Sequence, residues 1–600
     1  MTRTLGLRLG RALALAFACA AIVPGAAASA GRIDPALASA APGDTLVVLV
    51  EFTDRGERDA ADLARRLAAA ETALTPRSRA RRLRARVAPL VDERDLPVAP
   101  AYLDALRARG FAPLAVSRWL NRAAVRVAGA DLGRLAASPA VGRVTSVPRV
   151  VRSADPPGDT GVVPVGRVAP RGELAAASDY GLLAAAVSQI GVPALHDSGY
   201  AGAGVLVCVT DEGFNRWDTH EALRNTAIAP GMTRDFVQGD TIVVDTTQTG
   251  LFTHGTWVLG CLAGNRPGTY VGTAPAASYA LARTENSASE LPVEMLNWGL
   301  AAEWADSLGA DVIASSVAYG AFDVPAPAYT YASLDGRTTD ISRYAEIAAS
   351  KGMLVVNSVG NEGQHTWHWL LAPADVHGDS LVAVGAVDDL AQPAAFSSYG
   401  PTPDGRVKPD LAARGVAVPV PATTGGPAAY TTQNGTSFSA PLVAGLAACM
   451  LQARPAWTPR DVIRALRASA SRSSSPDDRV GYGIPNGALA LGWTPSGGLP
   501  VPGTAIVLGP SPMEPGGPGV RVRFVAAGVG TGANRGRVRV LDVAGRELAT
   551  LWRGEIQRGQ SVDVRWTGAD DAGRRVRSGI YFLALDAGGD VVAARVVVLD

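Results

Sequence analysis

The chain has 600 residues, which is too long for one hydrophobic core and predicts several domains. Hydrophobic residues make up 47% and charged residues 18% of the chain, a composition typical of globular rather than disordered proteins. The formal net charge is +1, so the sequence offers no electrostatic argument for nucleic-acid binding, and we expect none.

The N-terminal segment, residues 1–30, is predicted to be a secretory signal peptide. Arginines precede an apolar run at 12–23, and Ala28-Ser29-Ala30 offers a small-residue cleavage site. A lipoprotein anchor at Cys19 is the alternative, but the residues before that cysteine match a lipobox poorly. No later run reaches the roughly 18 apolar residues that cross a bilayer. We therefore expect a protein that is secreted or held at the cell surface and has no transmembrane segment.

Residues 31–152 are predicted to form a small α+β domain. The run 45–52 is a predicted strand, alanine- and arginine-rich helical patterns follow it, and further strands are expected at 123–127 and 144–147. Residues 153–179, rich in Gly, Pro and Val, are predicted to be an exposed linker.

Residues 180–495 alternate predicted strands with helices, which indicates an α/β domain with a parallel sheet. Strands are expected at 205–210, 278–282, 312–317, 353–359 and 381–387. Helices are expected at 255–264, 293–308, 340–350, 439–452 and 459–470.

A Pro/Gly-rich linker is expected at 496–519, and after it the hydrophobic period changes to two. Such alternation is typical of half-buried antiparallel strands, so residues 520–600 are predicted to form a C-terminal β-sandwich. The alternating apolar positions are Val520/Val522/Phe524, Val538/Val540, Val562/Val564/Trp566 and Ile580/Phe582.

The stretch Asn434–Pro441 places one hydroxyl, that of Ser437, in a tight turn of small residues ahead of a helix. Pro441 is expected in the first turn of this helix, where proline is tolerated, and the apolar run 442–451 predicts that the helix is buried. A serine there lies among backbone N–H groups at the positive end of the helix dipole, which suits a nucleophile whose attack creates an oxyanion. A serine N-cap is the commoner role, so the interpretation depends on residues upstream.

Three upstream residues supply the other groups that nucleophilic catalysis needs. Asp211 follows an apolar strand, His254 opens a helix, and Asn361 lies in a Gly-Asn-Glu-Gly loop. Serine needs a base, histidine titrates near neutrality, and a buried carboxylate fixes the histidine tautomer. An amide N–H group can then donate to the tetrahedral oxyanion.

These motifs resemble those of the subtilisin-like (subtilase) serine peptidases, over residues 180–495. The chain order Asp, His, Ser is that of subtilisin. The matching motifs are Asp211-Glu212-Gly213, His254-Gly255-Thr256, Gly360-Asn361-Glu362-Gly363, Phe396-Ser397-Ser398-Tyr399-Gly400-Pro401, Asp404-Gly405-Arg406-Val407-Lys408-Pro409-Asp410, Gly435-Thr436-Ser437-Phe438-Ser439-Ala440-Pro441 and Gly481-Tyr482-Gly483-Ile484-Pro485-Asn486. The resemblance implies a subtilisin-like parallel sheet with helices on both faces, and hydrolysis of protein or peptide substrates.

The resemblance also implies a role for each site residue. Asp211, His254 and Ser437 correspond to the catalytic triad, and Asn361 corresponds to the oxyanion-hole donor. Glu212 stands where the family usually has Thr or Ser, and its added charge would favour a protonated histidine. The walls that hold the substrate backbone and its P1 side chain correspond to Ser316, Val317, Ala318, Val359 and Gly360. The family usually has glycine at the position of Ala318, so the P1 pocket is expected to be narrower here.

The flanking regions resemble known accessory domains. Residues 31–152 resemble a subtilase propeptide, a folding chaperone and intramolecular inhibitor that is removed on maturation; an extra structural domain is the alternative. Residues 520–600 resemble the flagellar-hook-capping (FlgD)-like immunoglobulin-type domains, which predicts either attachment to the cell surface or a spacer. These regions together predict a secreted serine endopeptidase made as a zymogen.

The implied chemistry requires no cofactor. Calcium is common in the family, but no acidic loop in the sequence identifies a calcium site. His365 and His368 form a His-x-x-His pattern near Asp375 and His377, a set that could hold a transition metal. This set is loop-like and lacks a clear third ligand at a known spacing, so no metal site is predicted.

The chain beyond the signal peptide keeps an odd number of cysteines, so at least one must be a free thiol. They are Cys208, Cys261 and Cys449. All three lie in predicted buried elements and are expected to act as small core hydrophobes.

Two other functions fit parts of the sequence. The chain could be a catalytically silent surface-binding protein that keeps the fold, although all four site residues are intact. It could instead be an adhesion protein whose main function lies in the C-terminal β-sandwich.

Overall fold

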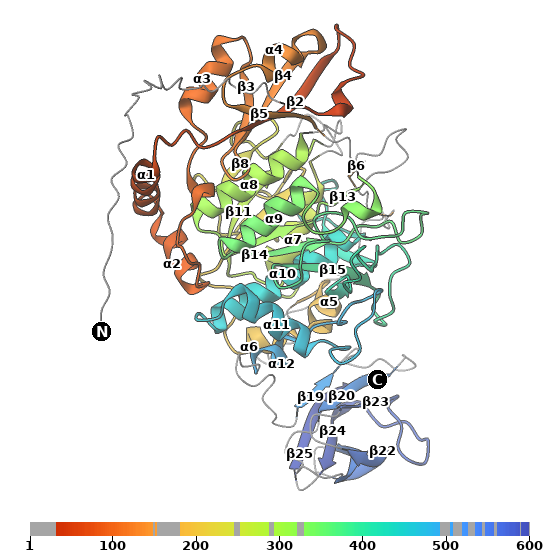
Figure 1. Ribbon diagram of the computed structural model, residues 1–600. Helices are drawn as coiled ribbons and strands as arrows, with labels where there is room; N and C mark the ends of the chain where they lie inside the picture. The colour runs from red at the N-terminus through yellow and green to blue at the C-terminus, as the bar shows by residue number, and fades with distance from the viewer. Residues whose placement is uncertain are drawn as a thin grey trace, which may run out of the picture.

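The computed structural model describes residues 32–147, 151–152, 156, 180–244, 252–286, 293–320, 329–492, 504–507, 519–525, 534–542, 546–556, 561–587 and 590–598 (Figure 1). The predicted signal peptide at 1–30 lies outside the described residues, as do most of the predicted linkers at 153–179 and 496–519. Three units follow one another along the chain.

The N-terminal unit is built on a five-stranded sheet with the order β1-β5-β2-β4-β3. Its strands are β1 (Arg32–Ile33), β2 (Thr45–Phe52), β3 (Pro113–Ser117), β4 (Arg122–Ala128) and β5 (Val141–Ser146). Its helices are α1 (Ala60–Thr72), α2 (Pro76–Arg84), α3 (Pro100–Ala108) and α4 (Leu132–Ala136). β1 and β5 are parallel, and the other neighbours are antiparallel. The small α+β region expected from the sequence is therefore present.

The central unit, residues 180–492, is built on a seven-stranded sheet with the order β16-β15-β14-β12-β7-β11-β8, in which all neighbours are parallel. Its strands are β7 (Leu206–Asp211), β8 (Thr233–Asp235), β11 (Ser278–Arg283), β12 (Val312–Ser315), β14 (Leu354–Ser358), β15 (Leu381–Val387) and β16 (Leu411–Arg414). Its helices are α5 (Ala184–Gln189), α6 (Val192–Asp197), α7 (His254–Ala263), α8 (Glu294–Leu308), α9 (Asp340–Ser350), α10 (Thr436–Ala453), α11 (Pro459–Ser469) and α12 (Gly487–Leu491). Short antiparallel pairs are β6 (Val151–Arg152) with β13 (Tyr319–Gly320), β9 (Asn265–Arg266) with β10 (Tyr270–Val271), and β17 (Val418–Pro421) with β18 (Tyr430–Gln433).

Helices cover both faces of the central sheet, as predicted. On β7, Val207 and Val209 join a hydrophobic cluster with residues of α7 and α10, whereas Cys208 joins a cluster with residues of α8 and α9. Alternate residues of a strand face opposite sides, so burial on both faces explains why this strand is continuously apolar. α10 is long and apolar enough to cross a membrane, but 94% of that stretch is buried inside the protein.

The N-terminal unit packs its sheet against the helices of the central unit. Val48 and Val50 of β2 point into the core of the N-terminal unit itself. Leu49 lies between them on the opposite face of the strand and joins the cluster that contains Trp298 of α8 and Tyr344 of α9. β2 is therefore apolar on both faces because one face closes its own unit and the other binds the central unit.

The C-terminal unit consists of two antiparallel sheets, with the orders β19-β20-β23 and β22-β21-β24-β25. Its strands are β19 (Thr504–Val507), β20 (Val520–Val525), β21 (Asn534–Asp542), β22 (Glu547–Ile556), β23 (Ser561–Trp566), β24 (Gly579–Ala587) and β25 (Asp590–Val598). Phe524 and Trp566 of one sheet share a hydrophobic core with Val538 and Leu583 of the other. The two packed antiparallel sheets predicted from the alternation are confirmed.

One strand of this unit faces the opposite way from the prediction. Ile580 is 41% exposed and Phe582 is half-buried, whereas Tyr581 and Leu583 are buried. β24 is apolar or aromatic at every position from 580 to 585, so its alternation does not decide which face is buried. Tertiary packing decides instead: the ring of Tyr581 contacts that of Trp566, with centroids 5.2 Å apart.

Candidate active site

The four residues singled out for catalysis lie around one edge of the central sheet. Asp211 is the last residue of β7, His254 is the first of α7, and Ser437 is the second of α10. Asn361 lies three residues beyond the end of β14. The carboxyl ends of parallel strands meet at one edge, which is where open α/β sheets place their sites.

Asp211 holds the ring of His254. Its Oδ1 lies 2.7 Å from His254 Nδ1 and also accepts the backbone N–H of Glu212 at 2.8 Å. Asp211 is fully buried, and the His254 side chain is 12% exposed. The ring of His254 lies 5.8 Å from the ring of Phe438, the residue that follows Ser437. A buried carboxylate on Nδ1 orients the imidazole and leaves Nε2 as the atom for proton transfer.

Glu212, the additional carboxylate beside Asp211, faces the start of α7. Its Oε1 accepts the backbone N–H of His254 at 3.3 Å, and its side chain is buried. Its backbone carbonyl accepts from Arg283 Nε at 3.0 Å, and Arg283 pairs with Asp235 at 2.6 Å. An anion at a helix N-terminus is favourable by about 0.3–2 kcal/mol, depending on burial. Glu212 therefore helps to fix the start of the helix that carries His254.

The turn around Ser437 differs from the prediction in one respect. α10 begins at Thr436, so Pro441 is its sixth residue and does not lie in the first turn. A proline there cannot donate to the carbonyl four residues earlier, which is that of Ser437. This carbonyl instead accepts from Ser316 Oγ at 2.8 Å, and Ser437 Oγ donates to the Ser316 carbonyl at 3.3 Å. Pro441 thus leaves the Ser437 main chain available to bind the segment that follows β12.

Asn361 is oriented by the residue before Ser437. Its Oδ1 accepts from the backbone N–H of Thr436 at 2.9 Å and from Thr436 Oγ1 at 3.0 Å. Both bonds use the amide oxygen, so the NH₂ group lies at the other end of the carboxamide, directed away from Thr436. Asn361 is 6% exposed. Thr436 therefore fixes which way a buried amide donor points.

The predicted substrate walls lie on two segments at the same edge. Residues 316–318 follow β12, and residues 359–360 follow β14, the neighbour of β12 in the sheet. All five residues are buried. Directly after the first segment, Tyr319–Gly320 of β13 pairs antiparallel with Val151–Arg152 of β6. The last two residues of the N-terminal unit thus add a strand at this edge, which is one way in which proteins bind extended peptides.

Leu371 packs on the second wall and was not found from the sequence. It donates its backbone N–H to the Val359 carbonyl at 3.0 Å, and its side chain is fully buried. A Cβ placed on Gly360 would lie 2.8 Å from Leu371 Cδ1, so the glycine is what admits the leucine. Leu371 lies in an irregular loop without hydrophobic periodicity, so no sequence signal points to it.

The histidines considered as metal ligands have other contacts. His365 Nδ1 binds the carboxylate of Glu362, and His368 stacks on Tyr399 with ring centroids 4.8 Å apart. Within the described ranges, no group of three or more His, Cys, Asp or Glu side chains is arranged to hold a metal ion.

The three cysteines among the residues that the structure describes are buried free thiols: Cys208, Cys261 and Cys449. Burial raises the pKa of Cys208 and Cys261 to about 12 and shifts that of Cys449 in the same direction. Thiols so poorly ionised at neutral pH are unreactive, which agrees with their prediction as core hydrophobes.

Fold and site together define a class: a parallel α/β domain with a buried Asp–His pair and a serine at the N-terminus of a buried helix. Residues 202–483 match the subtilase family (Peptidase S8). Residues 47–158 match the peptidase S8 propeptide domain of Bacteroidota. The chain belongs to the subtilase family.

Several relatives show how far the similarity extends. Subtilisin from Bacillus pumilus is 32% identical over 291 residues, which cover 48% of this chain and 90% of that protein. Subtilisin Savinase from Lederbergia lenta is 30% identical over 307 residues, covering 51% and 97%. With Subtilisin NAT from Bacillus subtilis subsp. natto, at 32% identity over 48% of this chain, the match spans 65% of the relative's length. Fervidolysin from Fervidobacterium pennivorans has a TM-score of 0.51 and 18% identity, covers 93% of this chain and 91% of its own, and shows the shared fold alone.

Proposed function

We propose that the protein is a secreted serine endopeptidase, made as a zymogen, that hydrolyses peptide bonds in protein or peptide substrates. The observation that carries the proposal is that the pair of His254 with buried Asp211, and Ser437 at the start of the buried helix α10, lie at one sheet edge. Membership of the subtilase family supports the same function. No organic cofactor is needed.

In the proposed reaction, Ser437 Oγ attacks the carbonyl carbon of the scissile peptide while His254 Nε2 takes the hydroxyl proton. Asp211 accepts the hydrogen bond from Nδ1 and stabilises the imidazolium that forms. The tetrahedral intermediate collapses, the C–N bond breaks, and His254 gives its proton to the leaving amine. Water, deprotonated by His254, then attacks the acyl-enzyme and releases the carboxylic acid and Ser437.

Asn361 is proposed to stabilise the oxyanion of that intermediate. Its amide oxygen is held by Thr436, and its NH₂ group is directed away from that residue. The positive end of the α10 dipole lies at the same place and also favours negative charge. Both groups are fixed before the reaction, which is the condition for effective stabilisation of a developing charge.

The N-terminal unit, residues 31–152, is proposed to be the propeptide, and the chain is proposed to cut itself between about residues 150 and 177. The match of 47–158 to a peptidase S8 propeptide domain supports the first part. The pairing of β6 with β13, beside the proposed substrate walls, supports the second. A strand in this position is proposed to compete with substrate. Residues 1–30 are proposed to export the precursor.

The C-terminal unit is proposed to be a FlgD-like immunoglobulin-type domain, spanning 520–600, that serves as a spacer or in attachment to the cell surface. One of its contacts with the central unit is a hydrogen bond from Arg523 to the Ser471 carbonyl at 2.8 Å. Deletion of 500–600 should leave peptide hydrolysis intact. Loss of hydrolysis with the central unit still folded would show that this domain contributes to the activity.

Peptide hydrolysis by the purified, processed protein tests the proposal. Ser437→Ala should abolish it, whereas Ser439→Ala should retain it. Both serines are buried on α10, and Ser439 Oγ donates to the Thr436 carbonyl at 3.0 Å. If the protein is instead a catalytically silent binding protein, the unmutated chain should not hydrolyse peptide. Hydrolysis that both variants retain would come from a contaminant.

A further inference from the structure

An arginine-rich helix of the N-terminal unit binds the central unit. The arginines of α2 are Arg77, Arg79, Arg81, Arg82 and Arg84. Arg77, Arg81 and Arg84 are spaced by four and three residues, so they share one face of the helix. Arg79, on another face, pairs with Glu71 inside the N-terminal unit. The helix therefore presents a row of positive charges in one direction.

Two of these arginines converge on Asp311, directly before β12. Arg84 lies 2.7 Å from Asp311 Oδ1, and Arg77 pairs with the other carboxylate oxygen. Arg77 also donates to the carbonyls of Gly309 and Gly204, each at 3.0 Å. The Asp311 side chain is 5% exposed, so these arginines supply much of the compensation for its buried charge.

A second pair of arginines binds Asp306, in the last turn of α8. Arg81 pairs with Asp306 and donates to the Ala310 carbonyl at 2.9 Å. Arg82 lies 2.7 Å from Asp306 and 2.7 Å from Asp95. The side chains of Arg81 and Arg82 are fully buried. Cations at the C-terminal end of α8 also interact favourably with the helix dipole.

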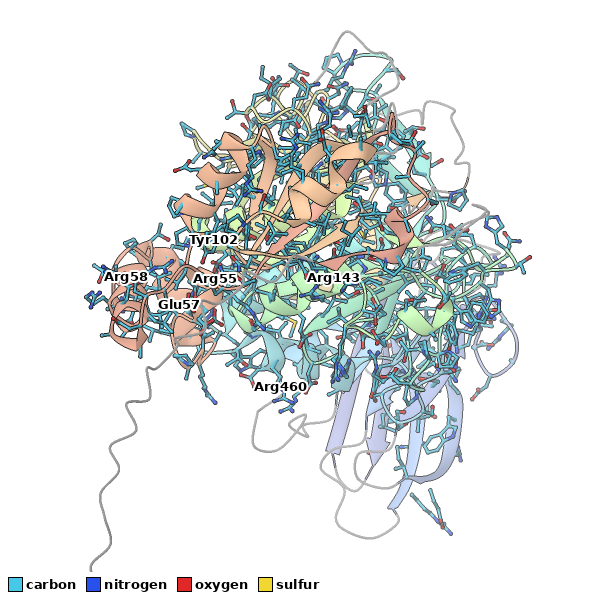
Figure 2. The ribbon with its side chains drawn as sticks, turned by 45° about the horizontal axis from the view of Figure 1, so that its top comes forward. Arg55, Glu57, Arg58, Tyr102, Arg143 and Arg460 are labelled. Carbon is cyan, nitrogen blue, oxygen red and sulfur yellow. The ribbon has the colours of Figure 1, made fainter. Side chains whose placement is uncertain are left out.

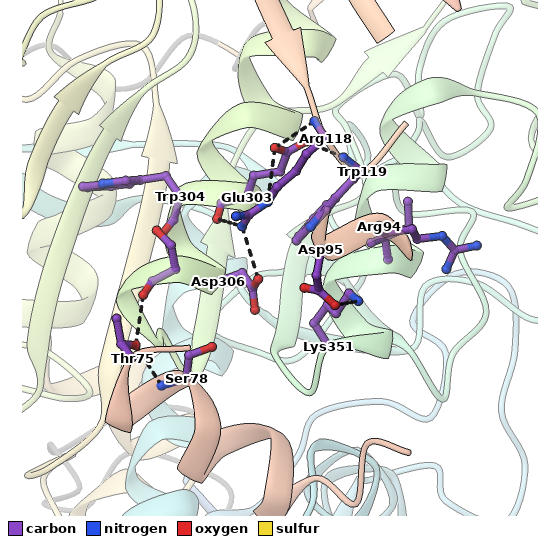
Figure 3. Close-up of polar contacts among 12 residues, drawn as sticks. Thr75, Ser78, Arg94, Asp95, Arg118, Trp119, Glu303, Trp304, Asp306 and Lys351 are labelled. Atoms are coloured by element: carbon purple, nitrogen blue, oxygen red, sulfur yellow. Dashed lines mark hydrogen bonds and ion pairs between the residues drawn. The ribbon is translucent and has the colours of Figure 1, made fainter. Parts of the chain in front are cut away.

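At a third contact the charges are exchanged: the central unit supplies the cation and the N-terminal unit supplies the carboxylates. Lys351 Nζ lies 2.7 Å from Asp92 and 2.6 Å from Asp95. Figure 3 shows Lys351 beside Asp95. Burial raises the pKa of Asp95, but Arg82 and Lys351 outweigh it and hold this pKa at about 2. We call this set of contacts the α2 interface; it comprises Arg77, Arg81, Arg82, Arg84, Asp92 and Asp95 against Asp306, Asp311 and Lys351.

Two glycines of the central unit let α2 approach this closely. Gly309 follows α8 with φ +80°, and a Cβ there would lie 2.6 Å from the backbone nitrogen of Ser78. Gly352 follows α9 with φ +86°, and a Cβ there would lie 2.5 Å from the Cβ of Ala85. Both positions suit glycine because of their backbone conformation, and both would collide with the α2 region if they carried side chains. The surface is thus shaped to fit the helix as well as charged to bind it.

The α2 interface lies at the opposite edge of the sheet from the candidate active site. Asp311 precedes β12 and Gly204 precedes β7, whereas Asp211 ends β7. Six residues of β-strand span roughly 20 Å. Contacts at this edge cannot occupy the position of a substrate at Ser437, so blocking of the candidate active site does not explain them.

We propose that the α2 interface is a second docking surface for the propeptide, specific for an arginine-rich helix, and that it keeps the cut propeptide on the central unit. Cleavage behind residue 152 then does not by itself release activity. The inference rests on the proposed zymogen function for its biological meaning. The retention of the cut fragment, however, is measurable whether or not the protein is a peptidase.

Retention is measured in the full chain carrying Ser437→Ala, with the recognition sequence of an external site-specific endopeptidase inserted within 157–179. After the external cut, size-exclusion chromatography at timed intervals gives the fraction of N-terminal fragment that still elutes with the rest. We expect the fragment to remain bound. Arg77→Gln/Arg84→Gln should release it about 30-fold faster or more, because loss of the partners of a buried charge acts mainly on the dissociation rate.

The control is Arg58→Gln/Arg65→Gln, which removes the same charge. Both arginines pair with Asp62 inside the N-terminal unit, and Figure 2 shows Arg58 at the outer edge of the molecule. This control should release the fragment at the unmutated rate. Equal release by the two double variants, or immediate release from the unmutated chain, would overturn the proposal.

A variant in the central unit tests the interface independently, in case Arg77→Gln/Arg84→Gln disturbs the folding of α2. Lys351→Met leaves α2 unchanged and removes the cation that binds Asp92 and Asp95. It should also accelerate release, and an unchanged rate counts against the proposal. In the chain with Ser437 intact, Arg77→Gln/Arg84→Gln should shorten the lag between cutting and peptide hydrolysis. If no chain ever hydrolyses peptide, the proposed function fails while the release measurement still decides the docking surface.

Discussion

Replacement of Asn361 separates the two functions that its carboxamide has in this account. Asn361→Ala removes both the acceptor for Thr436 and the NH₂ donor, whereas Asn361→Asp keeps an acceptor oxygen and removes the donor. We expect both variants to lose about 10²–10³-fold in kcat, with little change in KM, because the donor meets charge that exists only in the transition state. Asn361→Ala also leaves the buried Thr436 N–H without its acceptor, whereas the Thr436 hydroxyl keeps the Gly360 carbonyl at 3.3 Å. Asn361→Ala should therefore lower the free energy of unfolding by about 1–3 kcal/mol.

The assay is steady-state hydrolysis of a chromogenic peptide, with the concentration of processed enzyme fixed by active-site titration. Urea unfolding of the same preparations gives the stability difference. An unchanged kcat in both variants, or a loss confined to KM, would refute the oxyanion role. A rate loss in Asn361→Ala but not in Asn361→Asp would mean that the residue acts by positioning Thr436 and Ser437.

Three further predictions concern maturation, specificity and acid stability. Ser437→Ala should accumulate as the uncut chain in a host without other secreted proteases; a mature N-terminus identical to that of the unmutated protein would show that another protease cuts it. Leu371→Ala should open space beneath Gly360 and raise kcat/KM for larger P1 side chains about tenfold or more in a peptide library. An unchanged P1 profile would place the pocket elsewhere. The pKa of Asp95 is about 2 in the folded chain against an ordinary 3.8, so its stabilisation is complete only above about pH 5 and is lost progressively as the pH falls towards 2. Over that window the free energy of unfolding of the uncut chain should fall by up to about 2 kcal/mol more than that of Asp95→Asn, and equal declines would contradict the assignment.

The parts of the fold that could be predicted are those whose signal is local. β2 and β7 are continuously apolar over the lengths that the structure buries on both faces, so their positions were predicted almost to the residue. The residues of the candidate site could be predicted from the sequence for a related reason. Asp211, His254 and Ser437 each stand at the junction of a strand or helix with its loop, and parallel strands bring such junctions to one edge.

The parts that could not be predicted depend on contacts between distant segments. α10 begins at Thr436, which places Pro441 inside the helix, and Ser316 of a distant segment donates to the Ser437 carbonyl that the proline leaves without a helical donor. The facing of β24 follows from the packing of Tyr581 on Trp566.

The α2 interface could also be predicted only in part, because only one of its two surfaces has a pattern in the sequence. The spacing of Arg77, Arg81 and Arg84 is visible in the sequence and is compatible with one shared helix face. Their partners, Asp306 and Asp311, lie more than 200 residues away in the chain and carry no pattern that marks them as a binding surface.

Covalent labelling of the processed protein with a fluorophosphonate, followed by mass-spectrometric mapping of the modified peptide, tests the central claim most directly. We predict a single adduct on Ser437, absent in Ser437→Ala, present in Ser439→Ala and suppressed when His254 is replaced by Ala. An unlabelled protein with the central unit folded, or an adduct on another serine, would contradict the account.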